Sequence, residues 1–555
     1  MKRIALFCAA LLCAAVLTGC SGKASAGETP SETAPSEAAP AVESDHAANG
    51  EYVLRDAALR TGFEAQDDCR VFYEIFVGSF SDSDGDGTGD LRGIIDRFDY
   101  LNDGDPDSGL SLGVEGLWLT PIFRSPSYHK YDVADYYAVD PAFGTQEDLE
   151  ELIALCHERN VRLILDLPIN HTSSKNEWFV HFRTAHVNQD DSDPYYDFYS
   201  FRAKGESGSG TYAQLAGTQE YYECNFSGDM PELNFDSEAV RDAVVDVAQY
   251  YIDLGVDGFR FDAAKYVYFG DNGSSQSFWD WYLSELRARK PDLYSVFEVW
   301  DSDGITDVYY TASNCFNFTA SQSNGIIAET AQAGDVNRYT AYVQAYLDRI
   351  GAIRTDAMFV PFVTNHDMDR AAGFLTVASG RMQMAANLYL LGPGSPFIYY
   401  GEELGMRGSR GGANTDANRR LAMVWGDDDT VRDPSGTTYS RDKQIEQGAA
   451  EQIADSSSLY TYYKKLIMIR KANPEIARGE YHALSFSGTK LGGFTSTYDG
   501  STVCVLHNTT MNDITVDLGE LGLSFSEIRA VAGFGDAVLN GSELTLASQT
   551  SVVLR

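Results

Sequence analysis

The sequence predicts an α/β fold: a (β/α)8 TIM barrel with an irregular subdomain inserted after the third strand and an all-β sandwich domain at the C-terminus. Three observations support this prediction. Short apolar runs alternate with helical patterns from about residue 66, and eight such runs occur up to residue 400. A polar, aromatic stretch interrupts the alternation after the third run, and beyond residue 478 the pattern changes to short strands with Gly and Asn turns. Alternating strands and helices form a parallel sheet, and eight units suggest a closed barrel.

The eight expected strands are apolar runs bounded by helix or turn signals. The first three cover residues 71–76, 116–119 and 161–165, and the others end at Phe261, at Glu298, near Asn317, at Val363 and at Tyr400. Helical spacing of apolar residues marks the connections. One such helix has Ser237 at its N-cap position and ends at Gly255, and the helix before the third strand ends at Asn160.

These patterns divide the chain into segments. The expected segments are a signal peptide at 1–19, a disordered linker at 20–60, a barrel at 61–169 and 236–477, an inserted domain B at 170–235, and a C-terminal β-sandwich domain at 478–555. The linker is rich in Ser, Ala, Glu and Pro and has almost no large apolar residues, so it cannot bury a core.

The N-terminus has the features of a bacterial lipoprotein signal. Lys2 and Arg3 precede an apolar run at residues 4–17, which is too short to span a membrane in the mature protein. Leu17-Thr18-Gly19-Cys20 then resembles a lipobox, in which the lipid is attached to Cys20 after cleavage. We therefore expect an extracytoplasmic protein, lipid-anchored to the bacterial cell membrane or outer membrane.

Charge and composition narrow the range of partners. The net charge is −39 and the isoelectric point about 4.4, which argues against nucleic acid or an anionic membrane surface as a partner. A neutral polymer or small solute fits better, and the aromatic content of 12% suits the stacking of sugar faces on rings. We expect a monomer whose contact with the membrane is made only through the N-terminal lipid.

Charged residues gather where the expected strands end. The strand endings contain Asp166, Asn170 and His171; Arg260 and Asp262; Glu298; and Asn365, His366 and Asp367. In a barrel of this kind, function gathers at the C-terminal ends of the strands. Arg260 and Asp262 point the same way because side chains alternate along a strand, so the arginine favours the ionised carboxylate that a covalent nucleophile requires.

These segments resemble the four signature regions of the α-amylase family of glycoside hydrolases, and the likeness covers about residues 70–425. Residues 113–123 and the stretch Met230-Pro231-Glu232-Leu233-Asn234 match two supporting motifs. Because the chain has a lipobox as well as these motifs, it resembles bacterial lipoprotein α-amylases. The resemblance implies a retaining hydrolase that cleaves internal α-1,4-glucosidic bonds of starch, glycogen or maltooligosaccharides by double displacement.

The resemblance also implies a role for each matching residue. Asp262 would be the nucleophile, Glu298 the general acid/base, and Asp367 the carboxylate that binds and distorts the sugar. The implied substrate-binding residues are Tyr131 as a stacking platform, Lys265 on the leaving-group side, and Asp132, His171, Arg260, Asn365 and His366.

The chain departs from the family pattern at three positions. Phe297 stands where a small glycine is usual, which unsettles the fit around Glu298. Glu232 replaces an aspartate and Tyr266 a histidine, and Tyr266 puts in doubt the calcium site that many amylases hold between barrel and insert.

An acidic loop follows the first strand. Its carboxylates alternate with glycines in Asp82-Ser83-Asp84-Gly85-Asp86-Gly87-Thr88-Gly89-Asp90, a pattern that suits Ca2+. Gly93 stands at the twelfth position, where an EF-hand needs glutamate. The loop resembles a calcium site of part of the family, with ligands from Asp82, Asp84, Asp86, the Thr88 carbonyl and Asp90. A solvated acidic turn is the alternative.

The chemistry of the implied roles is consistent with the neighbouring residues. A retaining glycosidase needs two carboxyl groups about 5–5.5 Å apart, one ionised and one with a raised pKa. Phe297, Val299 and Trp300 favour the neutral form of Glu298. The alternatives are an oligo-α-glucosidase or glucanotransferase of the same family, or a surface glycan-binding lipoprotein without turnover.

Residues 125–132 favour endo-action. The family's α-glucosidases carry an aspartate three residues before the stacking tyrosine, whereas this chain has Tyr128, whose ring could stack on a further sugar. Tyr-His-Lys-Tyr resembles the Tyr-His-Gly-Tyr of α-amylases, with Lys130 in place of the glycine. We expect Lys130 to narrow the cleft and alter affinity, without changing which bond is cut.

Overall fold

The computed structural model describes residues 53–55, 65–105, 108–206 and 209–555. The predicted signal peptide, most of the linker and Cys20 lie outside the described residues. None of the described helices is long and apolar enough to cross a membrane.

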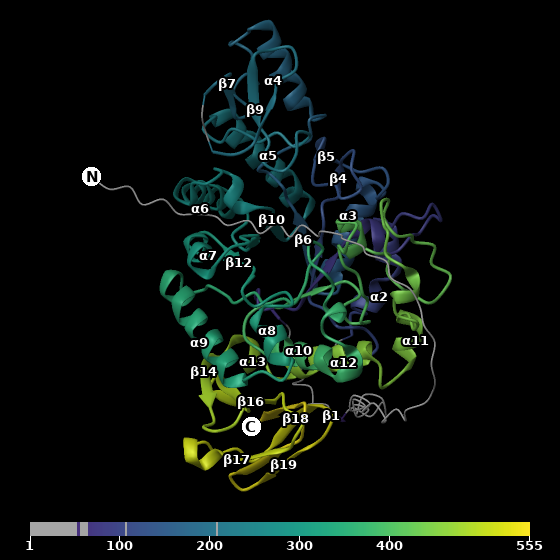
Figure 1. Ribbon diagram of the computed structural model, residues 1–555, viewed down its shortest axis with the longest axis vertical. Coiled ribbons are helices and arrows are strands. Elements are labelled where there is room, and N and C mark those ends of the chain that lie inside the picture. Colours follow the sequence, from purple (N-terminus) through teal and green to yellow (C-terminus); the bar gives the residue numbers. More distant parts are fainter. Residues whose placement is uncertain (1–52, 56–64, 106–107, 207–208) are drawn as a thin grey trace, which may run out of the picture. The chain divides into compact units, whose positions relative to one another are not determined.

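A seven-stranded parallel sheet forms the barrel and confirms the predicted fold class (Figure 1). Its strands, in spatial order, are β12 (Asn314–Cys315), β11 (Tyr294–Phe297), β10 (Gly258–Phe261), β6 (Arg162–Asp166), β3 (Gly116–Leu119), β2 (Phe72–Ile75) and β13 (Phe397–Tyr399). The six expected runs up to Asn317 each contain one of these strands, and so does the last run, which ends at Tyr400.

The seventh expected strand, ending at Val363, is present only as two isolated bridges. Phe316, after β12, pairs with Val360, and Phe362 pairs with Phe397 of β13, so this segment closes the ring between β12 and β13. Pro361 between the two bridges has no N–H to donate, and its carbonyl accepts from the Phe397 amide at 3.0 Å. The shortened pairing follows from this proline.

Aromatic side chains fill the barrel interior. The buried cluster consists of Phe72, Trp118, Ile164, Tyr294, Val296, Phe316, Phe318, Val360, Phe362, Met368 and Phe397. Phe72 and Phe397 stack with ring centroids 4.7 Å apart. A Cβ atom at Gly116 would come within 2.4 Å of the Phe72 ring, so the large ring requires glycine on the neighbouring strand. The barrel is therefore a packed core that holds the strand ends rigidly.

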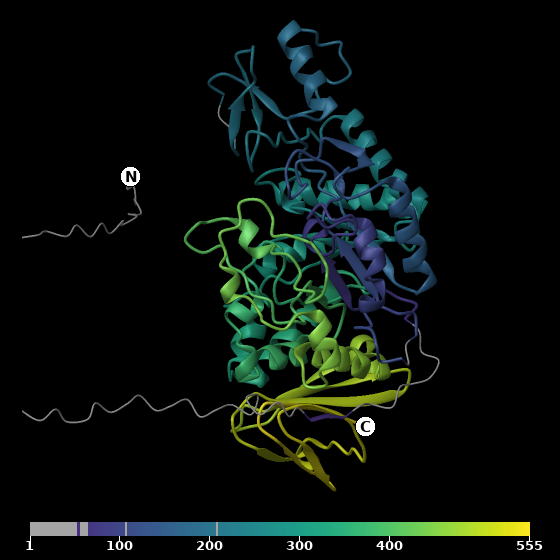
Figure 2. The ribbon, with the colours of Figure 1, turned by 90° about the vertical axis from the view of Figure 1, so that its right-hand side faces the viewer.

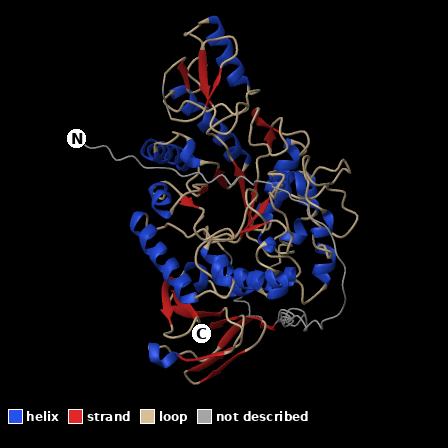
Figure 3. Ribbon diagram, in the orientation of Figure 1, coloured by secondary structure: helices blue, strands red, loops and turns tan. Residues whose placement is uncertain are grey.

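Helices surround the sheet (Figures 1 and 3). The longer ones are α3 (Gln146–Glu158), α5 (Glu238–Leu254), α6 (Asn272–Arg289), α9 (Val336–Ile353), α10 (Arg381–Leu390) and α12 (Leu459–Ala472). Helix α3 begins at a capping box made by Thr145 and Asp148. Helix α5 begins after Ser237 and ends at Gly255, whose φ of 106° favours glycine.

The insert contains helix α4 (Glu177–Asn188) and a small antiparallel sheet of β7 (Phe201–Ala203), β9 (Glu220–Glu223) and β8 (Tyr212–Gln214). One bridge ties its ends together, because His171 pairs with Glu232, and a second bridge joins Tyr199 in the middle of the insert to Leu233. The residue that leaves the barrel and the motif that ends the insert therefore lie side by side.

The C-terminal region is all-β (Figure 2). It has a separate apolar core. One sheet has the order β1-β18-β21-β16-β15-β14, and the other the order β17-β20-β19. The strands are β14 (Glu480–Ser485), β15 (Gly492–Tyr498), β16 (Ser501–Asn508), β17 (Ile514–Asp517), β18 (Ile528–Gly533), β19 (Ala537–Asn540), β20 (Glu543–Leu546) and β21 (Thr550–Leu554).

Strand β1 (Val53–Arg55) departs from the expected linker. It lies within residues 20–60 but pairs antiparallel with β18 over Val531 to Gly533. The backbone of β18 offers an edge that this N-terminal segment completes, which the composition of the linker does not reveal.

Candidate active site

Arg260 lies at the centre of a buried group of carboxylates at the strand ends. It leaves the end of β10, and its side chain is fully buried. Nη1 donates to both oxygens of Asp166 and to Oδ1 of Asp262, each at 2.8 Å, and Nη2 donates to Oε2 of Glu298 at 2.7 Å. One guanidinium thus holds the predicted nucleophile and the predicted acid/base side by side.

The pKa values of these two carboxyl groups are both perturbed. Burial raises the pKa of Glu298 to about 7; Arg260 opposes the shift, and the charges of Asp262 and Asp367 add to it. Burial also raises the pKa of Asp262, against the attraction of Arg260 and a hydrogen bond with Glu298. Arg260 does favour the charged form of Asp262, as expected, but burial is the larger influence.

Phe297 points away from this group. It alternates with Glu298 at the end of β11, is fully buried, and packs on Trp279 with ring centroids 4.7 Å apart. Its bulk therefore occupies the space between the sheet and helix α6, and the expected disturbance around Glu298 is absent at this position.

His366 connects Asp367 to Glu74 on strand β2. Its Nδ1 donates to Glu74 of β2 at 2.5 Å, and its Nε2 lies 3.1 Å from Oδ2 of Asp367 and 2.7 Å from the Tyr131 hydroxyl. Burial alone would lower the pKa of His366, yet the carboxylates of Asp367 and Glu74 raise it to about 10. His366 is therefore a cation with both ring nitrogens donating.

Tyr131 is held rigidly by the same network. Because Nε2 of His366 donates to it, its hydroxyl is free to donate to Oδ2 of Asp166, 2.7 Å away. The Tyr131 and His366 rings stack with centroids 5.4 Å apart. Glu74 and Asp166 were not among the predicted site residues, although a charge inside an apolar strand is a signal that could have identified Glu74.

Arg420 is the main residue that sequence reasoning missed. Its Nη2 donates to Oδ1 of Asp367 at 2.6 Å, its Nη1 to the Tyr128 hydroxyl at 3.1 Å, and its Nε to the His366 carbonyl at 3.1 Å. Burial opposes the ionisation of Asp367, but His366, Arg420 and Arg260 hold its pKa well below the usual range. The Asp367 side chain keeps 31% of its surface exposed, so it can still contact a ligand.

His171 and Lys265 both donate hydrogen bonds to backbone carbonyls. His171 is buried and neutral, because burial lowers its pKa to about 4, and its Nε2 donates to the Tyr131 carbonyl. Lys265 donates to the Trp300 carbonyl at 2.9 Å and to Asp301 at 3.0 Å.

Asp132 and Asn365 accept hydrogen bonds from residues of their own loops in this structure. Oδ1 of Asp132 accepts from the hydroxyls of Ser125 and Ser127, and Oδ1 of Asn365 accepts from the Asp367 amide at 3.0 Å. Both side chains are buried. Their contacts are those of residues that position neighbours.

Lys130 does not narrow the cleft, which corrects the expectation from its sequence position. Its side chain is buried, and Nζ donates to Asp140 at 2.8 Å. Its φ of 66° lies in the left-handed region, which explains physically why glycine suits this position.

The acidic loop after β2 brings together three of the four carboxylates named as calcium ligands, Asp82, Asp84 and Asp86. Oxygens of Asp82, Asp84 and Asp86 lie within 4.8 Å of one another, which fits a hard cation with oxygen ligands. Thr88 donates its amide to Asp86 at 2.6 Å. Asp90 caps helix α1 (Leu91–Asp96) by accepting from the Gly93 amide, and its other oxygen accepts from the Ser83 amide.

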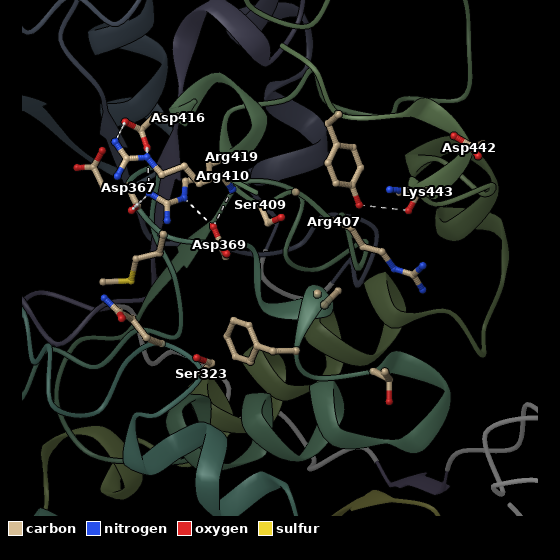
Figure 4. A pocket seen from close by; sticks show the side chains of 18 of the residues that line it. Ser323, Asp367, Asp369, Arg407, Ser409, Arg410, Asp416, Arg419, Asp442 and Lys443 are labelled. Carbon is tan, nitrogen blue, oxygen red and sulfur yellow. Dashed lines mark hydrogen bonds and ion pairs between the residues drawn. The ribbon is translucent and has the colours of Figure 1, made fainter. Parts of the chain in front are cut away.

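A cleft of about 1130 Å3 begins at Asp367 (Figure 4). Asp367, Asp369, Arg410, Asp416 and Arg419 lie together in one part of it, and Arg407, Asp442 and Lys443 lie in another. Trp300 lines the cleft and stacks on Phe318, with ring centroids 4.9 Å apart. A cleft of this volume can hold more than one sugar ring.

Comparison with known proteins identifies the family. The family model "Alpha amylase, catalytic domain" matches residues 74–479. The chain is 37% identical to Alpha-amylase 3 of Dictyoglomus thermophilum over 443 residues, covering 79% of this chain and 84% of that protein. It is 27% identical to an oligo-1,6-glucosidase of Bacillus cereus, covering 82% and 93%. The structure resembles Amy13B of Eubacterium rectale with a TM-score of 0.81 at 34% identity, covering 90% and 96%. The chain belongs to the alpha-amylase family of glycoside hydrolases.

Proposed function

We propose that this protein hydrolyses internal α-1,4-glucosidic bonds of starch and maltooligosaccharides with retention of configuration. The observation that carries the proposal is the contact of Arg260 with both Asp262 and Glu298, in a pair whose Glu298 pKa is about 7. An ionised carboxylate beside a protonated one is the combination that double displacement requires.

The residues divide the reaction between them. Glu298 protonates the glycosidic oxygen while Asp262 attacks the anomeric carbon, forming a covalent glycosyl ester. Esterification removes the negative charge of Asp262, which had helped to raise the pKa of Glu298, so Glu298 then acts as a base toward water. Asp367, fixed between His366 and Arg420, binds the sugar hydroxyls.

Endo-action is supported by the surroundings of Tyr128. Its hydroxyl is bound by Arg420, and no carboxylate occupies this position to grip a terminal glucose. The cleft of about 1130 Å3 that Asp367 lines leaves room for the chain to continue. An oligo-α-glucosidase is the second candidate, since the oligo-1,6-glucosidase of B. cereus is among the relatives.

The carboxylates of the acidic loop would hold Ca2+, with Asp82, Asp84 and Asp86 as the core of the site. The ion would supply structural support. Asp82 also accepts from the Thr430 hydroxyl at 2.6 Å, so the loop is tied to a segment far along the chain. No step of the reaction depends on it.

For localisation, we propose that a lipid on Cys20 anchors the protein outside the cytoplasm. A Cys20→Ser variant should then appear in the soluble extracytoplasmic fraction, whereas the unaltered protein stays with membranes. Retention of the variant in the membrane fraction would contradict the anchor.

Product analysis tests the enzymatic proposal. Early digestion of soluble starch should give reducing ends, with maltose and longer maltooligosaccharides. Glucose as the sole early product, with maltose and isomaltose as preferred substrates, would favour the oligo-α-glucosidase. No release of reducing sugar at all would favour a glycan-binding protein.

A further inference from the structure

Glu74 is a carboxylate inside the barrel that takes no direct part in the proposed reaction. It lies on β2, is only 1% exposed, and has Trp118 of β3 and Tyr399 of β13 as its partners on the adjoining strands. A buried charge is costly unless an opposite charge compensates it. Among the described residues, the only ion pair of Glu74 is with Nδ1 of His366, at 2.5 Å.

Both ring nitrogens of His366 face an acceptor. Nδ1 faces Glu74, whereas Nε2 lies 3.1 Å from Oδ2 of Asp367 and 2.7 Å from the Tyr131 hydroxyl. A neutral imidazole carries a single N–H and would turn a lone pair toward one of the two carboxylates. The imidazolium suits both sides at once, so the geometry requires two protons on the ring.

No other group near the His366 ring replaces Glu74 among the described residues. The remaining charged and titratable neighbours are Asp166, Arg260, Arg420, Tyr131 and His129. The two arginines disfavour a further positive charge, and Asp166 is already bound by Arg260 at 2.8 Å. Burial raises the pKa of Glu74 against the attraction of His366. Burial lowers the pKa of His366, but the carboxylates of Asp367 and Glu74 raise it to about 10, so the proton between Glu74 and His366 stays on the imidazole.

The proton on Nε2 also sets the direction of a hydrogen-bond chain. Because His366 donates to the Tyr131 hydroxyl, this hydroxyl donates onward to Asp166, 2.7 Å away. Without the proton on Nε2, the Tyr131 hydroxyl would turn to His366 and leave Asp166. A change in the protonation of His366 would therefore alter the hydrogen bonds of both Asp367 and Tyr131.

We propose that Glu74 is a positioning residue, whose negative charge keeps both ring nitrogens of His366 protonated and thereby fixes the orientation of Asp367 and Tyr131. Glu74 itself transfers no proton and touches no sugar. Its effect on the reaction rests on the proposed function, whereas the charge of His366 does not.

The charge of His366 can be measured directly. Glu74→Gln removes the charge and keeps the shape, because the amide can donate to Nδ1 of a neutral imidazole. Nitrogen NMR of protein labelled with 15N-histidine reports the protonation of each ring, and the signal missing from His366→Gln identifies His366. In the unaltered protein, His366 should remain a cation up to about pH 9. In Glu74→Gln it should become neutral by about pH 8, because only one carboxylate then favours the second proton.

Kinetics test the effect on the reaction. The value of kcat/KM for Glu74→Gln is divided by that of the unaltered protein, with one maltooligosaccharide at two pH values, so that the titration of Glu298 affects both proteins alike. The ratio should be near one at about pH 5.5, where His366 is protonated in both. It should be about tenfold lower at about pH 8.5, where the charged hydrogen bond to Asp367 becomes a neutral one. A purely structural role would lower the ratio equally at both pH values.

The matched control is Glu220→Gln in the insert. Glu220 contacts Nδ1 of His186 at 2.6 Å, and Nε2 of His186 faces the Tyr196 carbonyl. This variant should leave His366 a cation and give a ratio of one at both pH values.

A neutral His366 in the unaltered protein at about pH 8 would overturn the inference, even if Glu74→Gln did not fold. An equal ratio at the two pH values, with a folded Glu74→Gln protein, would also overturn it. Absence of hydrolysis by the unaltered protein would instead overturn the proposed function, and the NMR titration would still decide the charge of His366.

Discussion

Two acidic clusters in this molecule are stabilised in different ways. In the cluster of carboxylates around Asp262, protein cations supply the opposite charge. Arg260, His366 and Arg420 contact members of this cluster at 2.6–3.1 Å. In the loop of Asp82, Asp84 and Asp86, no ion pair with a protein cation forms among the described residues, and backbone amides are the main donors.

This difference indicates what each cluster requires. The first is complete within the chain and is pre-organised, because its cations already sit where charge must be held. The second leaves three carboxylate oxygens close together, and a bound cation would relieve their repulsion. Removing charges from the two clusters should therefore affect different properties: reaction rate in one and stability in the other.

The largest effect is expected for the two central carboxylates. Asp262→Asn should abolish starch hydrolysis, because an amide cannot form the ester. Glu298→Gln should lower kcat on starch about 10²- to 10⁴-fold through loss of acid/base catalysis. Both changes are nearly isosteric, so the melting temperature should change little. Asp348→Asn, on the outer surface of α9, is the control and should retain full activity. Substantial hydrolysis by either site variant would refute the assignment.

Arg420→Gln should produce the next largest effect. It removes the charged bond to Asp367 and the bond to Tyr128. Loss of a charged hydrogen bond of about 1.5–3 kcal/mol corresponds to a fall in kcat/KM of about 10- to 150-fold. Arg338→Gln, an exposed residue that pairs with Glu329, serves as the control. Equal kcat/KM in the two variants would show that the cation at Asp367 is dispensable.

The pH dependence should follow the proton on Glu298. Because its pKa is about 7 and the acid must be protonated for glycosylation, kcat/KM should fall as pH rises through about 7. Above this pKa, the decrease should approach tenfold per pH unit. A profile of kcat/KM against pH, with a maltooligosaccharide as the substrate, measures this decrease. A flat profile up to pH 9 would contradict the pKa assignment.

The smallest effect is expected for the acidic loop, and on stability. Excess chelator should lower the melting temperature by about 5 °C, as expected for loss of a ligand that binds only the folded state. Asp84→Asn should lower the melting temperature in calcium and respond less to chelator, whereas Asp348→Asn should respond like the unaltered protein. The same melting temperature with and without chelator, after prolonged incubation, would argue against the site.

The sequence alone determined the barrel and the residues that end its strands. Apolar runs of strand length between helical patterns leave little choice of fold, because each run needs burial on both faces. The motifs around Asp262, Glu298 and Asp367 follow the strands directly, so the fold necessarily brings them to one end of the barrel. These features depend on local pattern and chain order, which a sequence contains.

Only the tertiary structure determined the partners of those residues. Glu74 and Arg420 come from segments distant in sequence, and nothing local in the chain indicates that they meet His366 and Asp367. The same holds for β1, which joins a sheet more than 470 residues later in the chain, from Arg55 to Val531. The burial of Lys130 against Asp140 also removes this side chain from the cleft that it was expected to narrow. Such contacts depend on three-dimensional distance and on competition for burial, and these are defined only when the whole chain has folded.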